Sequence, residues 1–151
     1  MIVSKKIILK HQRILSFLYR LFGGNKYTGR RGNYLCLKNA FVRRTVIDIK
    51  GKNNRIVING EITRLKNCRV IVRGSNCTLT IGIGCNLSDV EFYIEDDNSS
   101  IEIGDYVTMG ASHLAVIEGT NITVGENSLF SSGVVIRSGD SHSIIQDDNG
   151  K

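Results

Sequence analysis

Large apolar residues recur six positions apart near the end of this chain, a spacing that the common regular elements do not produce. Between Val124 and Ile145 the series is Val124, Phe130 and Ile136. An amphipathic helix repeats about every 3.6 residues and a half-buried strand about every 2. A spacing of six fits a triangular coil instead. Each of its three flat sides places one large residue at the axis, and small residues turn the corners.

The six-residue spacing lies within a longer repeat of about 22 residues. From Leu35 onward, β-rich apolar segments form two interleaved series with steps of 19 to 23 residues. The first series is Leu37, Ile58, Ile81, Ile103 and Val124, and the second is Ile49, Val72, Ile94, Ile117 and Ile136. The surplus over three six-residue sides falls into polar corner loops. We therefore predict an all-β solenoid of about five coils, stabilised by stacked aliphatic side chains.

The turn chemistry follows from composition. The 151 residues, the size of one domain, include sixteen Gly and no Pro, so the corners depend on Gly and Asn, which tolerate positive φ. The four cysteines are Cys36, Cys68, Cys77 and Cys85. None forms a C-x-x-C pair, so no metal is expected, and we interpret them as buried free thiols in a reducing cytoplasm. Cys85 occupies the small-residue position that Val107 and Ser128 fill in later repeats.

Three segments are expected along the chain: an amphipathic helix over 1–24, a polar linker over 25–34 and the repeat region over 35–151. Residues 1–47 contain eleven Lys or Arg and no Asp or Glu. The helix has three interpretations: a cap on the first coil, a peripheral membrane contact through residues 1–22, or an oligomer contact. It has too many charges for a transmembrane span. The Arg30–Arg31 pair has no interleaved aromatic residues, so no nucleic-acid partner is expected.

The stretch FSSGVVIRSGDSHSI, which runs from Phe130 to Ile144 after the six-residue repeats, resembles the hexapeptide-repeat acyltransferases. It is most similar to the sugar O-acetyltransferases of bacterial capsule and surface-polysaccharide clusters, and the resemblance covers roughly Ile56 to Lys151. The resemblance implies a left-handed parallel β-helix. It also implies a homotrimer with the active site between subunits, acetyl-CoA as co-substrate, and a sugar or polysaccharide precursor as acceptor.

His142 is the candidate general base in this resemblance. Acyl transfer from a thioester to a sugar hydroxyl needs a group that takes the hydroxyl proton near neutral pH, and imidazole suits that task. Asp140, two residues before it, would orient the ring. His113 and Ser132 are candidate acceptor-binding residues, although a structural role for His113 and a corner role for Ser132 remain open. Glu118 and Arg137 are expected to form an ion pair between adjacent coils.

Members of this family continue through further coils that line the acetyl-CoA channel, and this chain ends at Lys151, where those coils would begin. We therefore expect either an O-acetyltransferase in the cytoplasm or at the inner face of the membrane, or a non-catalytic β-solenoid. The latter would be an assembly or binding module, or an inactive fragment of such an enzyme.

Overall fold

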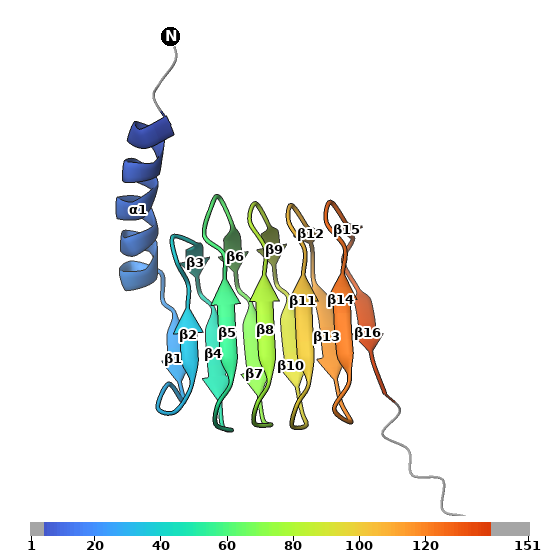
Figure 1. Ribbon diagram of the computed structural model, residues 1–151. Coiled ribbons are helices and arrows are strands. Elements are labelled where there is room, and N and C mark those ends of the chain that lie inside the picture. The colour runs from blue at the N-terminus through green and yellow to red at the C-terminus, as the bar shows by residue number, and fades with distance from the viewer. Residues whose placement is uncertain (1–4, 140–151) are drawn as a thin grey trace, which may run out of the picture.

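The computed structural model describes residues 5–139, with side chains described from His11 onward. These residues form a parallel β-solenoid of about five coils, preceded by helix α1 (Lys5–Phe22) (Figure 1). The expected fold class is confirmed. The segment 25–34, predicted as a linker, contains β1, which pairs with β4 in the first of three sheets.

Each coil contributes one strand to each of three parallel sheets, A, B and C. Sheet A consists of β1 (Lys26–Thr28), β4 (Val46–Ile49), β7 (Arg69–Val72), β10 (Glu91–Ile94), β13 (Ser112–Val116) and β16 (Val134–Arg137). Sheet B consists of β2 (Tyr34–Cys36), β5 (Arg55–Ile58), β8 (Thr78–Ile81), β11 (Ser100–Ile103) and β14 (Asn121–Val124). Sheet C consists of β3 (Phe41–Arg43), β6 (Arg64–Lys66), β9 (Asn86–Ser88), β12 (Thr108–Met109) and β15 (Leu129–Phe130).

The core consists of columns of aliphatic residues that stack from coil to coil. In sheet B the column is Ile58, Ile81, Ile103 and Val124, all buried, which confirms the first predicted series. Sheet C contributes the column that includes Leu65, Leu87, Met109 and Phe130. Burying these side chains against one another is the main driving force for stacking the coils.

The second predicted series is wrong in its last two members. In sheet A, Ile49, Val72 and Ile94 are in register with Val116 rather than Ile117. Ile136 pairs with Leu114, in a neighbouring column. The error arises because four consecutive residues, 114 to 117, are apolar and buried, so periodicity cannot tell which of them faces the axis.

The corners of the coils contain residues in the left-handed backbone conformation. Asn53, Asn76 and Asn98 occupy equivalent positions with φ of 57°, 57° and 60°. Asparagine adopts this conformation at lower cost than most residues, which confirms the predicted role of the polar loops. A second corner contains Ile62 and Tyr106, with φ of 52° and 57°. There the conformation is imposed by the stacked coils rather than by local preference.

Buried polar side chains join the coils at these corners. The Asn54 side-chain amide donates to the Gly74 carbonyl at 3.0 Å, and its oxygen accepts from the Cys77 backbone N–H at 2.8 Å. Asn33 binds the next coil in the same way, since its side-chain oxygen accepts from the Asn54 N–H at 2.8 Å. One buried side chain thus satisfies two backbone groups that no strand ladder reaches.

The three buried cysteines occupy the three different corners of the coil. Cys68, Cys77 and Cys85 each immediately precede a strand of a different sheet, and each thiol contacts a backbone carbonyl one coil further on, at 3.5, 3.2 and 3.1 Å. Thr63 makes the equivalent contact through its hydroxyl, to the Gly82 carbonyl at 3.0 Å. All four cysteines are free. Burial raises the pKa of Cys77 and Cys85, and raises the pKa of Cys68 to about 11.

Helix α1 lies at the N-terminal end of the solenoid and packs mainly on β3. Gln12 and Ser16 are buried there, and the Gln12 amide donates to the Gly60 carbonyl at 2.9 Å. Tyr19 meets Phe41 edge to face at 5.7 Å. The Asn25 amide ties the end of the helix to the Val42 carbonyl at 2.8 Å. No helix in the described part of the chain is long and apolar enough to cross a membrane.

The described side chains of α1 differ in chemistry from one side of the helix to the other. Gln12 and Ser16 are buried, whereas the large apolar residues Ile14, Phe17, Leu18, Leu21 and Phe22 are exposed. Phe17 and Leu21 line a hollow together with Leu35 and Leu37 of the first coil. The role of the helix as a cap stays a prediction.

Replacing Asn54 with Ala removes both bonds of a buried bridge. We expect the free energy of unfolding to fall by about 2–3 kcal/mol, because the Cys77 N–H and the Gly74 carbonyl lose their side-chain partner in a dry corner. Urea denaturation measures the change. Asn86→Ala, at an exposed asparagine on β9, is the matched control and should cost less than about 0.5 kcal/mol. Equal losses in the two variants would contradict this role for Asn54.

Cys68 should make the solenoid sensitive to alkaline pH. In the unfolded chain the thiol titrates near its ordinary pKa of 9.0, and in the folded protein its pKa is about 11. Its contribution is therefore complete below pH 9.0 and is lost as the pH rises through about 11, a total of roughly 2–3 kcal/mol. Cys68→Ser should flatten the dependence of stability on pH over this window. A slope as steep as that of the parent chain would count against this assignment.

Candidate functional site

Three charged or titratable residues form a ladder across neighbouring strands on the outer face of sheet A. Arg69, Glu91 and His113 begin or nearly begin β7, β10 and β13 and are in direct register. Arg69 Nη1 lies 2.8 Å from Glu91 Oε2, and His113 Nδ1 lies 3.1 Å from Glu91 Oε1. Both oxygens of one carboxylate are therefore engaged, each by a different neighbouring coil.

This contact determines how His113 presents its ring. When the ring is protonated, this distance makes an ion pair with Glu91. The His113 and Glu91 side chains are 34% and 26% exposed, so the pair lies in a partly desolvated surface. The arrangement holds an imidazole beside a carboxylate on the surface of the coil that begins with β13.

Ser132 lies one coil further on, at the same end of sheet A. It is exposed in the turn between β15 and β16, and the following residue, Gly133, donates its N–H to the Ala111 carbonyl at 2.7 Å. His113 pairs with Val135 of β16, and Ser132 lies three residues before Val135, in the turn that leads into β16. The two predicted acceptor-binding residues therefore lie toward the same end of sheet A, on adjacent coils.

His142 and Asp140, the predicted base and its orienting carboxylate, lie outside the described residues. The last described residues are Ser138 and Gly139. Ser138 hydrogen-bonds with Thr120, and a side chain at Gly139 would meet Ile117. The described chain thus ends just after β16, stacked on the corner that follows β13 one coil earlier. His113 lies near the start of β13, about 13 Å from that corner at 3.3 Å per residue.

The predicted ion pair between Glu118 and Arg137 does not form. Arg137 is in register with Ala115, and Glu118 belongs to the following corner, where its backbone N–H donates to Asp96 Oδ2 at 2.6 Å. The misassignment has the same origin as the error in the second apolar series: Ile117 and Ile136 are not equivalent positions.

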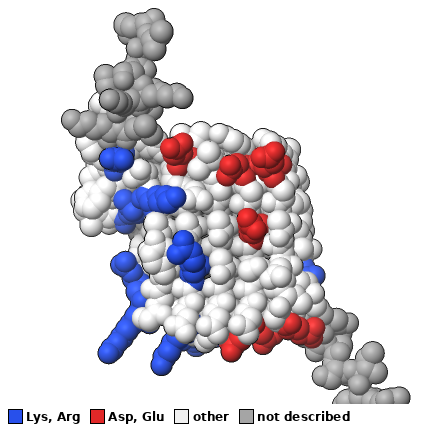
Figure 2. All heavy atoms as spheres, in the orientation of Figure 1, with Lys and Arg blue, Asp and Glu red and all other residues white. Residues whose placement is uncertain are grey.

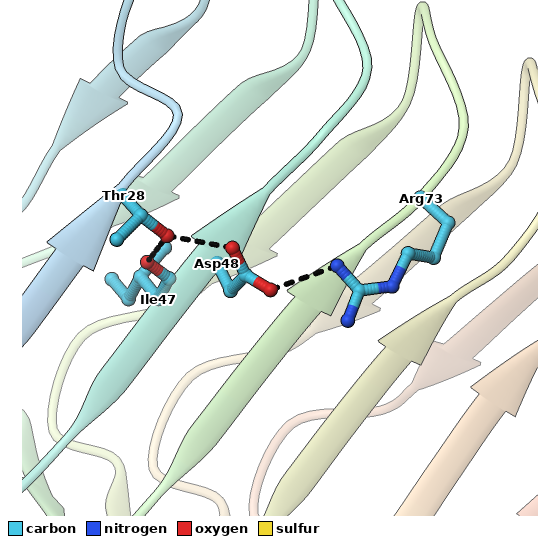
Figure 3. Close-up of polar contacts among 4 residues, drawn as sticks. All are labelled: Thr28, Ile47, Asp48 and Arg73. Atoms are coloured by element: carbon cyan, nitrogen blue, oxygen red, sulfur yellow. Dashed lines mark hydrogen bonds and ion pairs between the residues drawn. The ribbon is translucent and has the colours of Figure 1, made fainter.

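A second polar network on sheet A stabilises the first coils. Asp48 on β4 accepts from the Thr28 hydroxyl at 2.6 Å and pairs with Arg73 at 2.8 Å (Figure 3). These bonds to the ionised form, first Thr28 and then Arg73, lower the pKa of Asp48. The network connects β1, β4 and the end of β7 and includes no histidine or nucleophile, so its role is structural. In the described part of the chain, no group of three or more His, Cys, Asp or Glu is placed to hold a metal ion.

Comparison with known proteins identifies a distant relative. The polysialic acid O-acetyltransferase of Neisseria meningitidis is 26% identical over 114 residues, a match that covers 71% of this chain and 49% of that protein. The chain thus spans about half the length of the relative. No protein-family model matches the chain. The solenoid and the distant similarity both fit the hexapeptide-repeat acyltransferases.

Sequence reasoning missed Glu91 and Arg69, although a signal for them is present. Residues 69, 91 and 113 are separated by 22 positions each, the length of the repeat, so their side chains must stack once the period is known. The local motif around His113 does not contain this signal, because its partner lies one coil away rather than nearby in sequence.

Proposed function

We propose that this protein transfers an acetyl group from acetyl-CoA to a sugar hydroxyl during the synthesis of a surface polysaccharide. The observation that carries the proposal is the similarity of a 22-residue-period β-solenoid to a polysialic acid O-acetyltransferase. The D-S-H sequence at 140–142, which follows the last described strand, supplies a residue type suited to the chemistry.

In the proposed reaction, the acceptor hydroxyl oxygen attacks the thioester carbonyl carbon. His142 removes the hydroxyl proton as general base while Asp140 holds the ring in one orientation. Backbone N–H groups stabilise the oxyanion of the tetrahedral intermediate. The carbon–sulfur bond then breaks, and the proton passes from His142 to the departing thiolate. The products are an O-acetylated sugar and coenzyme A, without a covalent enzyme intermediate.

His113 and Ser132 are proposed to bind the acceptor. Sugar hydroxyls both donate and accept hydrogen bonds, so the partly exposed imidazole of His113 beside Glu91 suits them. The exposed Ser132 hydroxyl lies toward the same end of sheet A. In a homotrimer this end would face a neighbouring subunit, which would supply the remainder of the acetyl-CoA site.

A non-catalytic solenoid is the second candidate, and the partial match to the relative favours it. The match covers only 49% of that protein. Such a module would use the ladder surface of sheet A to bind a sugar chain without turnover.

The two candidates differ in whether the purified chain releases coenzyme A in the presence of an acceptor. We expect acetyl transfer to oligosaccharides with free hydroxyls, polysialic acid among them, and a loss of about 100-fold or more in kcat for His142→Ala. His113→Ala should chiefly raise KM for the acceptor. His11→Ala, at a histidine in α1, is the matched control and should retain full activity.

Transfer that persists in His142→Ala would disprove the role of this residue as base. A folded chain that binds oligosaccharide but neither binds nor hydrolyses acetyl-CoA would disprove the enzyme and support the binding module.

A further inference from the structure

Helix α1 buries polar side chains against the solenoid and exposes an apolar face. At about 100° per residue, Gln12, Ser16 and Tyr19 fall on one side of the helix, the side that faces β3. The exposed residues centre on the opposite side. Ile14, Phe17, Leu18, Leu21 and Phe22 are 54, 56, 42, 61 and 78% exposed. These five residues form an exposed apolar face on α1.

Single exposed apolar side chains are common on protein surfaces, but a contiguous face marks an interaction site. The apolar face extends into hollows on both flanks of the helix. One, of about 320 Å³, is lined by Leu18, Phe22 and Arg43. The other, of about 390 Å³, is lined by Phe17, Leu21 and Arg30. Each hollow combines apolar walls with an arginine.

The charge around the helix identifies the kind of partner. Lys and Arg gather over the first coils, and Asp and Glu over the later ones (Figure 2). Within the described residues, no acid precedes Asp48, whereas Arg13 and Arg20 flank the apolar face and Arg43 and Arg44 lie on the coil beneath it. A second copy joined through the same face would bring these cations together. An anionic surface with an apolar interior satisfies both features at once.

We propose that α1 is a membrane-docking element that binds the interface of a bilayer containing anionic lipids. Phe17, Leu18, Leu21 and Phe22 enter the region between headgroups and acyl chains, and the flanking arginines bind lipid phosphate. This inference rests on α1 and the first coil alone and is independent of the proposed acetyl transfer.

The arrangement of α1 and the sheets gives the orientation of the docked protein. The helix axis runs roughly parallel to the strands and therefore across the solenoid axis (Figure 1). A helix lying flat in the interface would stand the solenoid on its first coil. His113 lies on β13, four strand spacings beyond β1 in sheet A, which places it about 20 Å from the first coil. The sheet A ladder then lies away from the lipid headgroups.

A single tryptophan tests the docking directly, because the sequence contains none. Phe22→Trp places the reporter at the most exposed position of the apolar face, and Leu129→Trp, at a residue 77% exposed on β15, is the control reporter. We expect vesicles of phosphatidylcholine with phosphatidylglycerol to shift the emission of the Phe22→Trp variant to the blue and to co-sediment the protein. Added salt should weaken both effects. The emission of the control reporter should not shift.

Substitution of the apolar face separates insertion from charge attraction. Leu18→Glu with Leu21→Glu should abolish co-sedimentation. Leu129→Glu should leave it unchanged, and circular dichroism should show that all variants remain folded. Arg13→Gln with Arg20→Gln should lower affinity for the anionic vesicles several-fold.

Three results would overturn the proposal. The first is failure of the parent chain to bind vesicles that contain phosphatidylglycerol. The second is a blue shift that appears without lipid, increases with protein concentration and is lost when Leu18→Glu is added, which would make the face a contact between copies. The third is equally tight binding to soluble polyglutamate without a blue shift, which would indicate an acidic protein partner instead.

Discussion

The stacking of one coil on the next is the constraint on which the rest of this structure depends. Strands of adjacent coils pair in parallel, so each backbone N–H finds its acceptor about 22 residues away rather than nearby in sequence. An inserted or deleted residue in one side of a coil would move every later apolar side chain off its column. The corners tolerate differences in length between coils. They contain the left-handed residues, the Asn54 bridge and the three buried thiols.

The same constraint explains which residues on the surface meet. Side chains one repeat apart stack whether or not they attract one another, so a useful cluster needs suitable residues at equal positions in successive coils. Arg69, Glu91 and His113 form such a series on sheet A. Thr28 and Asp48 form another, to which Arg73 is added diagonally from the third coil. The first holds a histidine at the surface, and the second fastens the strands that begin the solenoid.

The fold can be predicted from the sequence because its period is long, regular and carried by large apolar residues. The sequence repeat correctly predicts each member of the column of Ile58, Ile81 and Ile103. Sheet A is predicted less well, because a run of four apolar residues at 114–117 hides the alternation. Of the candidate site, the placement of His113 and Ser132 toward the same end of sheet A follows from the register. The partnership of His113 with Glu91 requires the period to be applied to charged residues too.

The orientation of α1 cannot be predicted from its own sequence, because an amphipathic pattern gives two faces without saying which one packs. The decision depends on what the neighbouring coils offer. The second coil presents a backbone carbonyl at Gly60 that needs a donor, and Gln12 provides one. An apolar side chain there would leave that buried carbonyl without its partner, at a cost comparable to the gain from burying a leucine. The polar face therefore packs inward, and the hydrophobic face stays on the surface, surrounded by the cations that the first coils supply. The coils stack along one axis, and different positions along this axis carry different chemistry. An apolar, basic face lies at the first coil, and His113 lies four strand spacings further along sheet A.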